Sequence, residues 1–259
     1  MDALLHELER NPDQEEAYER LQGFVGGLRD TELAGVLDAL GARTTWAAGE
    51  LRRAVVRRWA EKEPQAAAAW ASGLPGGAAH RDALEQVAVA WAGSEPASGW
   101  AWLTSLPMGP DEESAALQFA YEVSRTSPTE GLAIAAELGP SPERDECLAY
   151  AASQWAGADA DSALAWARDV ADPGLRQQVL AGVSVPAAAQ NPVGAATLAA
   201  ALLEPGAQQQ RAVVSIVQRW APHSPAEAAA WVRMFPDGPA RVAAVEELVG
   251  IRAAQGGGE

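Results

Sequence analysis

The sequence of 259 residues is 48 % hydrophobic and carries 35 acidic against 19 basic side chains, a formal net charge of −16 at pH 7. So acidic a chain repels phosphate, which argues against nucleic acid and anionic membrane surfaces as partners, whereas basic partners would be attracted. No apolar run approaches the ~20 residues that a membrane-spanning helix needs, so membrane insertion is not expected.

Residues 1–61 are predicted to form helices that precede and cap a repeat array. Met1 to Leu28 is predicted to form two helices, with Asn11-Pro12-Asp13 as the break, because proline disfavours a helix interior. Asp30 to Leu40 and Thr45 to Ala60 follow as a degenerate helical hairpin.

From residue 59 onward the sequence repeats with a period of 32 residues, and one step is 33 residues long. Eight of the ten tryptophans occupy two columns of this repeat, and Trp46 and Trp100 are the exceptions. The first Trp column holds Trp59, Trp91, Val123, Trp155, Ala187 and Trp220, and the second holds Trp70, Trp102, Ile134, Trp166, Leu198 and Trp231. This period is typical of helical hairpins that stack on one another.

An N-cap-like residue and a proline mark the start of a short helix in nearly every repeat. Ser127 with Glu130, and Ser224 with Glu227, are also spaced as capping boxes. The extra residue of the fifth repeat is expected in its loop, around 204–210. The starts are Glu63-Pro64, Glu95-Pro96, Ser127-Pro128, Asp159-Ala160, Asn191-Pro192 and Ser224-Pro225.

These patterns predict an all-α fold: an α-solenoid of about six 32-residue helix-turn-helix repeats over residues 62–253, with a frayed tail at 254–259. In length and plan the hairpins resemble the tetratricopeptide class, although paired tryptophans and the N-cap–Pro pair replace its consensus. The tandem pattern resembles Trp/Ala-rich helical-repeat proteins of bacteria over about residues 59 to 250. This resemblance implies the architecture and a bacterial origin, and it supplies no activity.

No constellation of catalytic or metal-binding residues stands out. The histidines His6, His80 and His223 are scattered, and Cys147 is interpreted as a packed thiol beside Leu148. Nucleotide-binding glycine loops and nucleophile-elbow motifs are absent. We therefore expect no cofactor and no metal, and predict that the protein is not an enzyme.

Two groups of residues are candidates for partner binding. The first lies on the short helices: Trp100, and the variable positions Thr104, Arg168 and Arg233. Trp100 is either an inter-repeat packing residue or an exposed anchor of the kind that dominates many interfaces. The Trp columns themselves are interpreted as core, because aliphatic residues replace tryptophan in them.

The second group is the only basic cluster, Leu51 to Trp59, here called the arginine segment. Its candidates Arg52, Arg53 and Arg57 are predicted to pair with nearby carboxylates or, alternatively, to bind an acidic peptide or a second copy of the chain.

The sequence favours a non-catalytic scaffold that binds a protein or peptide on the surface of a solenoid, with a basic partner as one option. The alternatives are an enzyme or enzyme accessory with a site in a concave groove, and a self-assembling protein that uses the apolar stripe of the last helix. The N-terminus does not resemble a signal peptide, so a cytoplasmic location is the default, with an exported form after removal of a leader as the alternative. The oligomeric state is left open.

Overall fold

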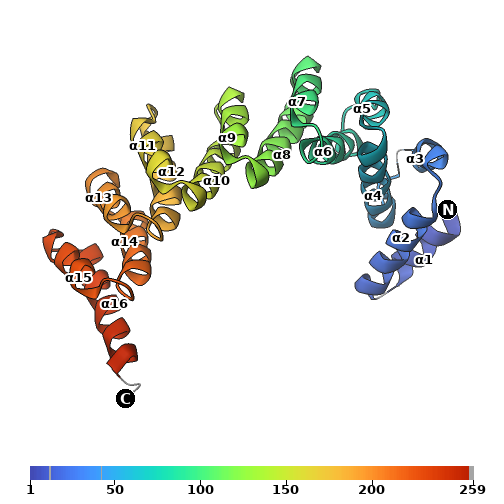
Figure 1. The fold of residues 1–259 in the computed structure, drawn as a ribbon. Helices are drawn as coiled ribbons and strands as arrows, with labels where there is room; N and C mark the ends of the chain where they lie inside the picture. Colours follow the sequence, from blue (N-terminus) through green and yellow to red (C-terminus); the bar gives the residue numbers. More distant parts are fainter. Residues whose placement is uncertain (12, 42, 257–259) are drawn as a thin grey trace. The chain divides into compact units, whose positions relative to one another are not determined.

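The computed structural model describes residues 1–11, 13–41 and 43–256, and within these ranges every regular element is a helix (Figure 1). The two predicted N-terminal helices are present, and helices also cover most of the two segments that were predicted to follow as a hairpin. Asp13 starts the second helix, since its carboxylate accepts hydrogen bonds from the N–H groups of Glu15 and Glu16; Pro12 lies outside the described residues. The bounds are α1 Asp2–Arg10, α2 Gln14–Gly27, a 3-10 turn Asp30–Glu32, α3 Leu33–Leu40 and α4 Trp46–Lys62.

Short and long helices alternate from α5 onward, and the all-α prediction is confirmed. The short helices start at the predicted residues: α5 Pro64–Ser72, α7 Pro96–Ser105, α9 Pro128–Glu137, α11 Ala160–Asp169, α13 Pro192–Leu202 and α15 Pro225–Met234. The long helices are α6 Ala78–Ala92, α8 Pro110–Thr126, α10 Pro142–Ala158, α12 Pro173–Ala187, α14 Ala207–Trp220 and α16 Pro239–Gly256. Because α16 continues to Gly256, only the last three residues of the predicted frayed tail lie outside the described part of the chain.

The chain divides into two compact units, Met1–Val123 and Ser124–Glu259. Within the first unit, α4 packs against α6, and α5 packs against both. Within the second, the long helices α10, α12, α14 and α16 pack in succession, each beside its short helix. This packing is repeat-like inside each unit. No described helix is long and apolar enough to cross a membrane.

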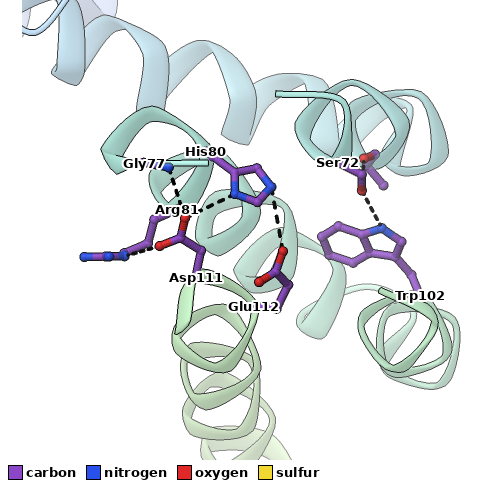
Figure 2. Close-up of polar contacts among 8 residues, drawn as sticks. Ser72, Gly77, His80, Arg81, Trp102, Asp111 and Glu112 are labelled. Carbon is purple, nitrogen blue, oxygen red and sulfur yellow. Dashed lines mark hydrogen bonds and ion pairs between the residues drawn. The ribbon is translucent and has the colours of Figure 1, made fainter. Parts of the chain in front are cut away.

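Tryptophan pairs join each of four long helices to the short helix that follows it. The ring centroids are 5.5 to 6.3 Å apart and the planes are tilted by 31° to 54°. Neighbouring short helices are also linked, since the Trp102 indole N–H donates to Ser72 Oγ at 3.3 Å (Figure 2). The structure therefore supports the interpretation of the Trp columns as packing positions. The pairs are Trp59–Trp70, Trp91–Trp102, Trp155–Trp166 and Trp220–Trp231.

The predicted capping boxes at Ser127 and Ser224 are wrong, because neither serine side chain accepts a hydrogen bond from its helix. Asp159 and Asn191, at the same repeat position, do accept one, at 3.1 Å and 2.7 Å. A carboxylate or amide oxygen lies one bond further from the backbone than a serine hydroxyl. With the shared N-cap conformation, only the longer side chain reaches the free N–H groups.

The extra residue of the fifth repeat lies in α13 and not in the predicted loop. The connection from α13 to α14 has the same length as that from α15 to α16, whereas α13 has 11 residues and α15 has 10. Leu203 consequently takes the buried helix-end position that Phe235 holds in the next repeat, at 3 % and 7 % exposure. Leu202 lies one 32-residue step after Val170, the buried helix-end residue of the preceding repeat, but Leu202 itself is exposed.

Candidate protein-binding groove

An apolar groove of about 870 Å³ lies in the second unit, where the ends of α13 and α15 meet the turns that lead into α14 and α16. Proline and glycine stop the short helices there and turn the chain, as in Pro236-Asp237-Gly238. Small residues on α13 keep the space open. Among the residues that line it are Ala200, Leu203, Trp231, Met234, Phe235 and Pro236.

The groove has an aromatic floor and an exposed apolar rim. Trp231 and Phe235 are each 7 % exposed and meet edge to face, with ring centroids 4.9 Å apart and planes at 82°. Met234 is 75 % exposed, the largest value among the exposed large apolar side chains of the described chain. A flexible thioether at the rim of an aromatic pocket suits the docking of apolar side chains from a partner.

Buried hydrogen bonds fix one wall of the groove. The Gln209 side chain is buried and donates from Nε2 to the carbonyl oxygens of Ala199, at 3.3 Å, and Leu203, at 3.0 Å. These bonds satisfy carbonyl groups at the end of α13 that the helix leaves free. The turn that forms this wall is thus held by hydrogen bonds within the chain.

The surroundings of the groove are electrically neutral. Residues 192–256 contain five arginines and five acidic residues, so the acidic excess of the chain lies elsewhere. At the rim, Asp237 is already paired with Arg241 at 2.5 Å. The expected preference for basic partners therefore has no basis at this site.

Of the predicted short-helix candidates, only Arg233 lies beside the groove. It is exposed on α15 next to Met234, and Arg168 is exposed on α11. In the part of the chain that the structure describes, neither guanidinium forms an ion pair. Both remain available for a partner.

Trp100 and Thr104 belong to the first unit, on α7. Trp100 is half-buried and stacks on Phe119, with centroids 6.0 Å apart and planes at 27°. The Thr104 hydroxyl donates to the carbonyl oxygens of Trp100, at 2.9 Å, and Ala101, at 3.2 Å. The packing interpretation of Trp100 is thus favoured over that of an exposed anchor.

The arginine segment contacts its own unit. Arg53 pairs with Asp82 at 3.0 Å and with Glu50, as predicted. Arg57 instead donates from Nε and Nη2 to Gln86 Oε1, at 3.0 and 2.8 Å.

Arg52 differs from the other arginines because it is buried. It is 5 % exposed and donates to the carbonyl oxygens of Gly41 and Arg43, both at 2.9 Å. Burial lowers the pKa of this guanidinium. With no surface to offer, Arg52 fixes the turn between α3 and α4.

Arg53, Arg57 and Arg58 line a cavity of about 370 Å³ between α2 and α4, together with Tyr18. Arg58 donates to the Leu28 carbonyl oxygen at 2.7 Å and pairs with Asp30 at 3.1 Å. Because all three guanidinium groups already have partners inside the unit, this cavity is a weaker candidate site than the apolar groove.

A polar cluster joins α6 to the start of α8 (Figure 2). Asp111 accepts from the Gly77 N–H at 3.2 Å and pairs with Arg81 at 2.9 Å. His80 Nδ1 lies 3.2 Å from Asp111, and its Nε2 lies 3.9 Å from Glu112. No group of acidic, histidine or cysteine side chains in the described ranges is arranged to hold a metal. The cluster holds two helices together.

Asp111 is expected to contribute a pH-dependent part of the stability. Burial opposes its ionisation, but the hydrogen bonds from Gly77, His80 and Arg81 outweigh burial and lower its pKa. Because the pKa of Asp111 is lower in the folded than in the unfolded chain, its ionisation stabilises the fold. This stabilisation is complete above the unfolded-state pKa of about 4, and it is lost as the pH falls through the folded-state pKa. Asp111→Asn should cost about 1–3 kcal/mol at neutral pH, and the difference should shrink in acid. Urea unfolding of the two chains at several pH values measures this difference, and Asp169→Asn, at an exposed position, is the control. A loss of stability in Asp111→Asn that does not depend on pH would contradict the prediction.

Comparison with protein-family models, with curated proteins and with solved structures finds no match for this chain. The resemblance to Trp/Ala-rich bacterial repeat proteins therefore stays a prediction. The arrangement of helices defines an all-helical protein with repeat-like packing.

Sequence reasoning missed the groove. One signal was present, namely the single 33-residue step, which falls in the repeat that forms one wall. The pattern located the irregularity within about five residues but gave no sign that two neighbouring turns leave a space between them.

Proposed function

We propose that the chain is an α-solenoid of about six helical hairpins and acts as a non-catalytic scaffold that binds a protein segment. The observation that carries this proposal is the apolar groove, with its buried Trp231 and Phe235 and its exposed Met234. Pockets that bind ligands are commonly concave and mostly apolar with a few polar groups. The groove lacks close acidic pairs, which an enzyme of the acid–base kind would need.

The ligand is an apolar segment, and an amphipathic helix suits the groove best. An aliphatic or aromatic side chain would enter between the two turns and contact the aromatic floor, while Met234 adapts to its shape. Arg233, next to Met234 and without an ion pair to any described residue, would donate hydrogen bonds to a carboxylate at the edge of the ligand. Neutral surroundings make the contact depend on apolar burial more than on charge.

A displayed library of random helical peptides, selected on the full chain, tests the proposal. Selected peptides should carry large apolar residues three or four positions apart. Met234→Glu should weaken their binding at least about tenfold, because a carboxylate would be buried against the apolar ligand. The affinity of a labelled selected peptide should change less than about threefold between roughly 50 and 500 mM salt.

Met108→Glu is the matched control. Met108 is 57 % exposed, belongs to the first unit and is not among the residues that line the groove. If both substitutions weaken the selected peptides equally, or if neither does, the groove is not the binding site.

A further inference from the structure

The helix α16 carries an exposed apolar face that we call the valine stripe. It consists of Val242, Val245 and Val249, which are 56 %, 43 % and 61 % exposed. Spacings of three and four residues put the three side chains on one side of the helix. Such a stripe is the kind of surface that another protein covers.

The face of helix α14 that corresponds to the valine stripe of α16 is buried. One repeat before Val245 and Val249, helix α14 has Val213 and Val217, both 0 % exposed, and α14 packs directly against α16. Three residues beyond Val217 on the same face, Trp220 contacts Trp231 of the next short helix. This face of a long helix therefore points toward the hairpin that follows, and within the described residues no hairpin follows α16.

The residue type at Val242 also departs from the repeat pattern. At this repeat position every earlier long helix has a polar residue or glycine, and valine occurs only where the face is open. The earlier residues are Gly49, Arg81, Glu113, Asp145, Gln177 and Gln210.

We propose that a second copy of this chain covers the valine stripe, through antiparallel packing of α16 on α16 about a two-fold axis. In each unit the long helices pack on one another, as α14 does on α16. The α16 helix of a second copy is a long helix with the same exposed face, so it can continue this packing. In this register Val245 of one copy contacts Val249 of the other copy, and Val249 of the first contacts Val245 of the second. The stem of Arg252 covers Val242. A two-fold contact brings identical patches together.

Charge permits this contact despite the net charge of −16. Residues 192–256 contain equal numbers of basic and acidic side chains, so two copies of this end do not repel each other strongly. The proposal does not rest on the groove, because the stripe lies further along α16 than the groove residues Pro239 and Ala240.

Sedimentation equilibrium of the full chain between about 1 and 500 µM tests the proposal. One helix pair lies at the small end of specific interfaces, so a dissociation constant on the order of 10–100 µM is expected. The double substitution Val245→Glu and Val249→Glu should raise it at least about twentyfold. Val193→Glu is the matched control, since Val193 is 57 % exposed on α13, and it should leave the dissociation constant unchanged.

Cross-linking tests the register. Chains with Val245→Cys and chains with Val249→Cys are mixed and oxidised, and the mixed disulfide should exceed both same-residue disulfides. Cys147 does not compete, because it is fully buried and burial raises its pKa to about 12. A strict monomer over the whole concentration range, or a dimer that survives both glutamates, overturns the proposal. Predominance of same-residue disulfides overturns the antiparallel arrangement.

Discussion

Trp220→Ala is expected to lower the free energy of unfolding by about 3–5 kcal/mol, the range for truncation of a buried aromatic residue. Trp220 is 5 % exposed and its ring lies 6.0 Å from Trp231. The substitution removes the ring contact between α14 and the next short helix, and it leaves the Trp231 ring without one of its two aromatic neighbours. Urea unfolding followed by circular dichroism measures the loss.

Trp46→Ala is the control for Trp220→Ala. Trp46 lies outside both Trp columns and is 45 % exposed at the start of α4. Its truncation should change the stability by less than about 1 kcal/mol. Equal losses at the two positions would mean that the Trp columns have no special part in joining the helices.

The starts of the short helices were predictable because their signals are local. An N-cap residue followed by proline acts within one turn of the chain, and no distant contact is needed to interpret it. The Trp columns were equally informative, since a long period with two fixed aromatic positions implies the same neighbour in each copy. The four observed pairs have that arrangement.

Other features depended on side-chain length or on small shifts that the pattern does not show. Leu202 and Leu203 are the same residue type, so the sequence could not tell which of them ends α13 on the buried side. One residue rotates a helix by about 100°, and this exchange exposes Leu202 and buries Leu203. Similarly, Arg52 stands in a column that otherwise holds mostly leucine, valine or alanine, and only the carbonyl groups of the neighbouring turn explain its burial.

The groove was not predictable for a different reason. Each of its walls is an ordinary turn, and its volume arises from the distance between two turns that are one repeat apart in the sequence. That distance follows from the packing of α14 on α16, which no single position encodes.

Gly99→Ala is expected to cost about 1–3 kcal/mol although alanine is the better helix former. Gly99 is buried on α7, and a Cβ atom there would lie 2.6 Å from Phe119 Cε2 and 3.1 Å from Trp91 Cβ. Phe119 is fully buried and cannot move aside without losing its own packing. Gly23→Ala, where nothing lies within 4 Å of the added atom, should instead stabilise α2 by about 0.5–1 kcal/mol.

The sharper test is a double-mutant cycle with Phe119→Ala. Alone, this substitution should cost about 3–5 kcal/mol, because it empties a fully buried site and removes the stack with Trp100. In that background the nearest obstacle to a side chain at Gly99 is gone, and only the Trp91 contact remains to oppose the better helix propensity of alanine. The cost of Gly99→Ala should then fall by at least about 1 kcal/mol and approach zero. Additive costs would show that Gly99 is needed for its backbone and not for the ring of Phe119. That result would remove the physical reason for a glycine at a position where four of the other five short helices have alanine and α9 has Gly131.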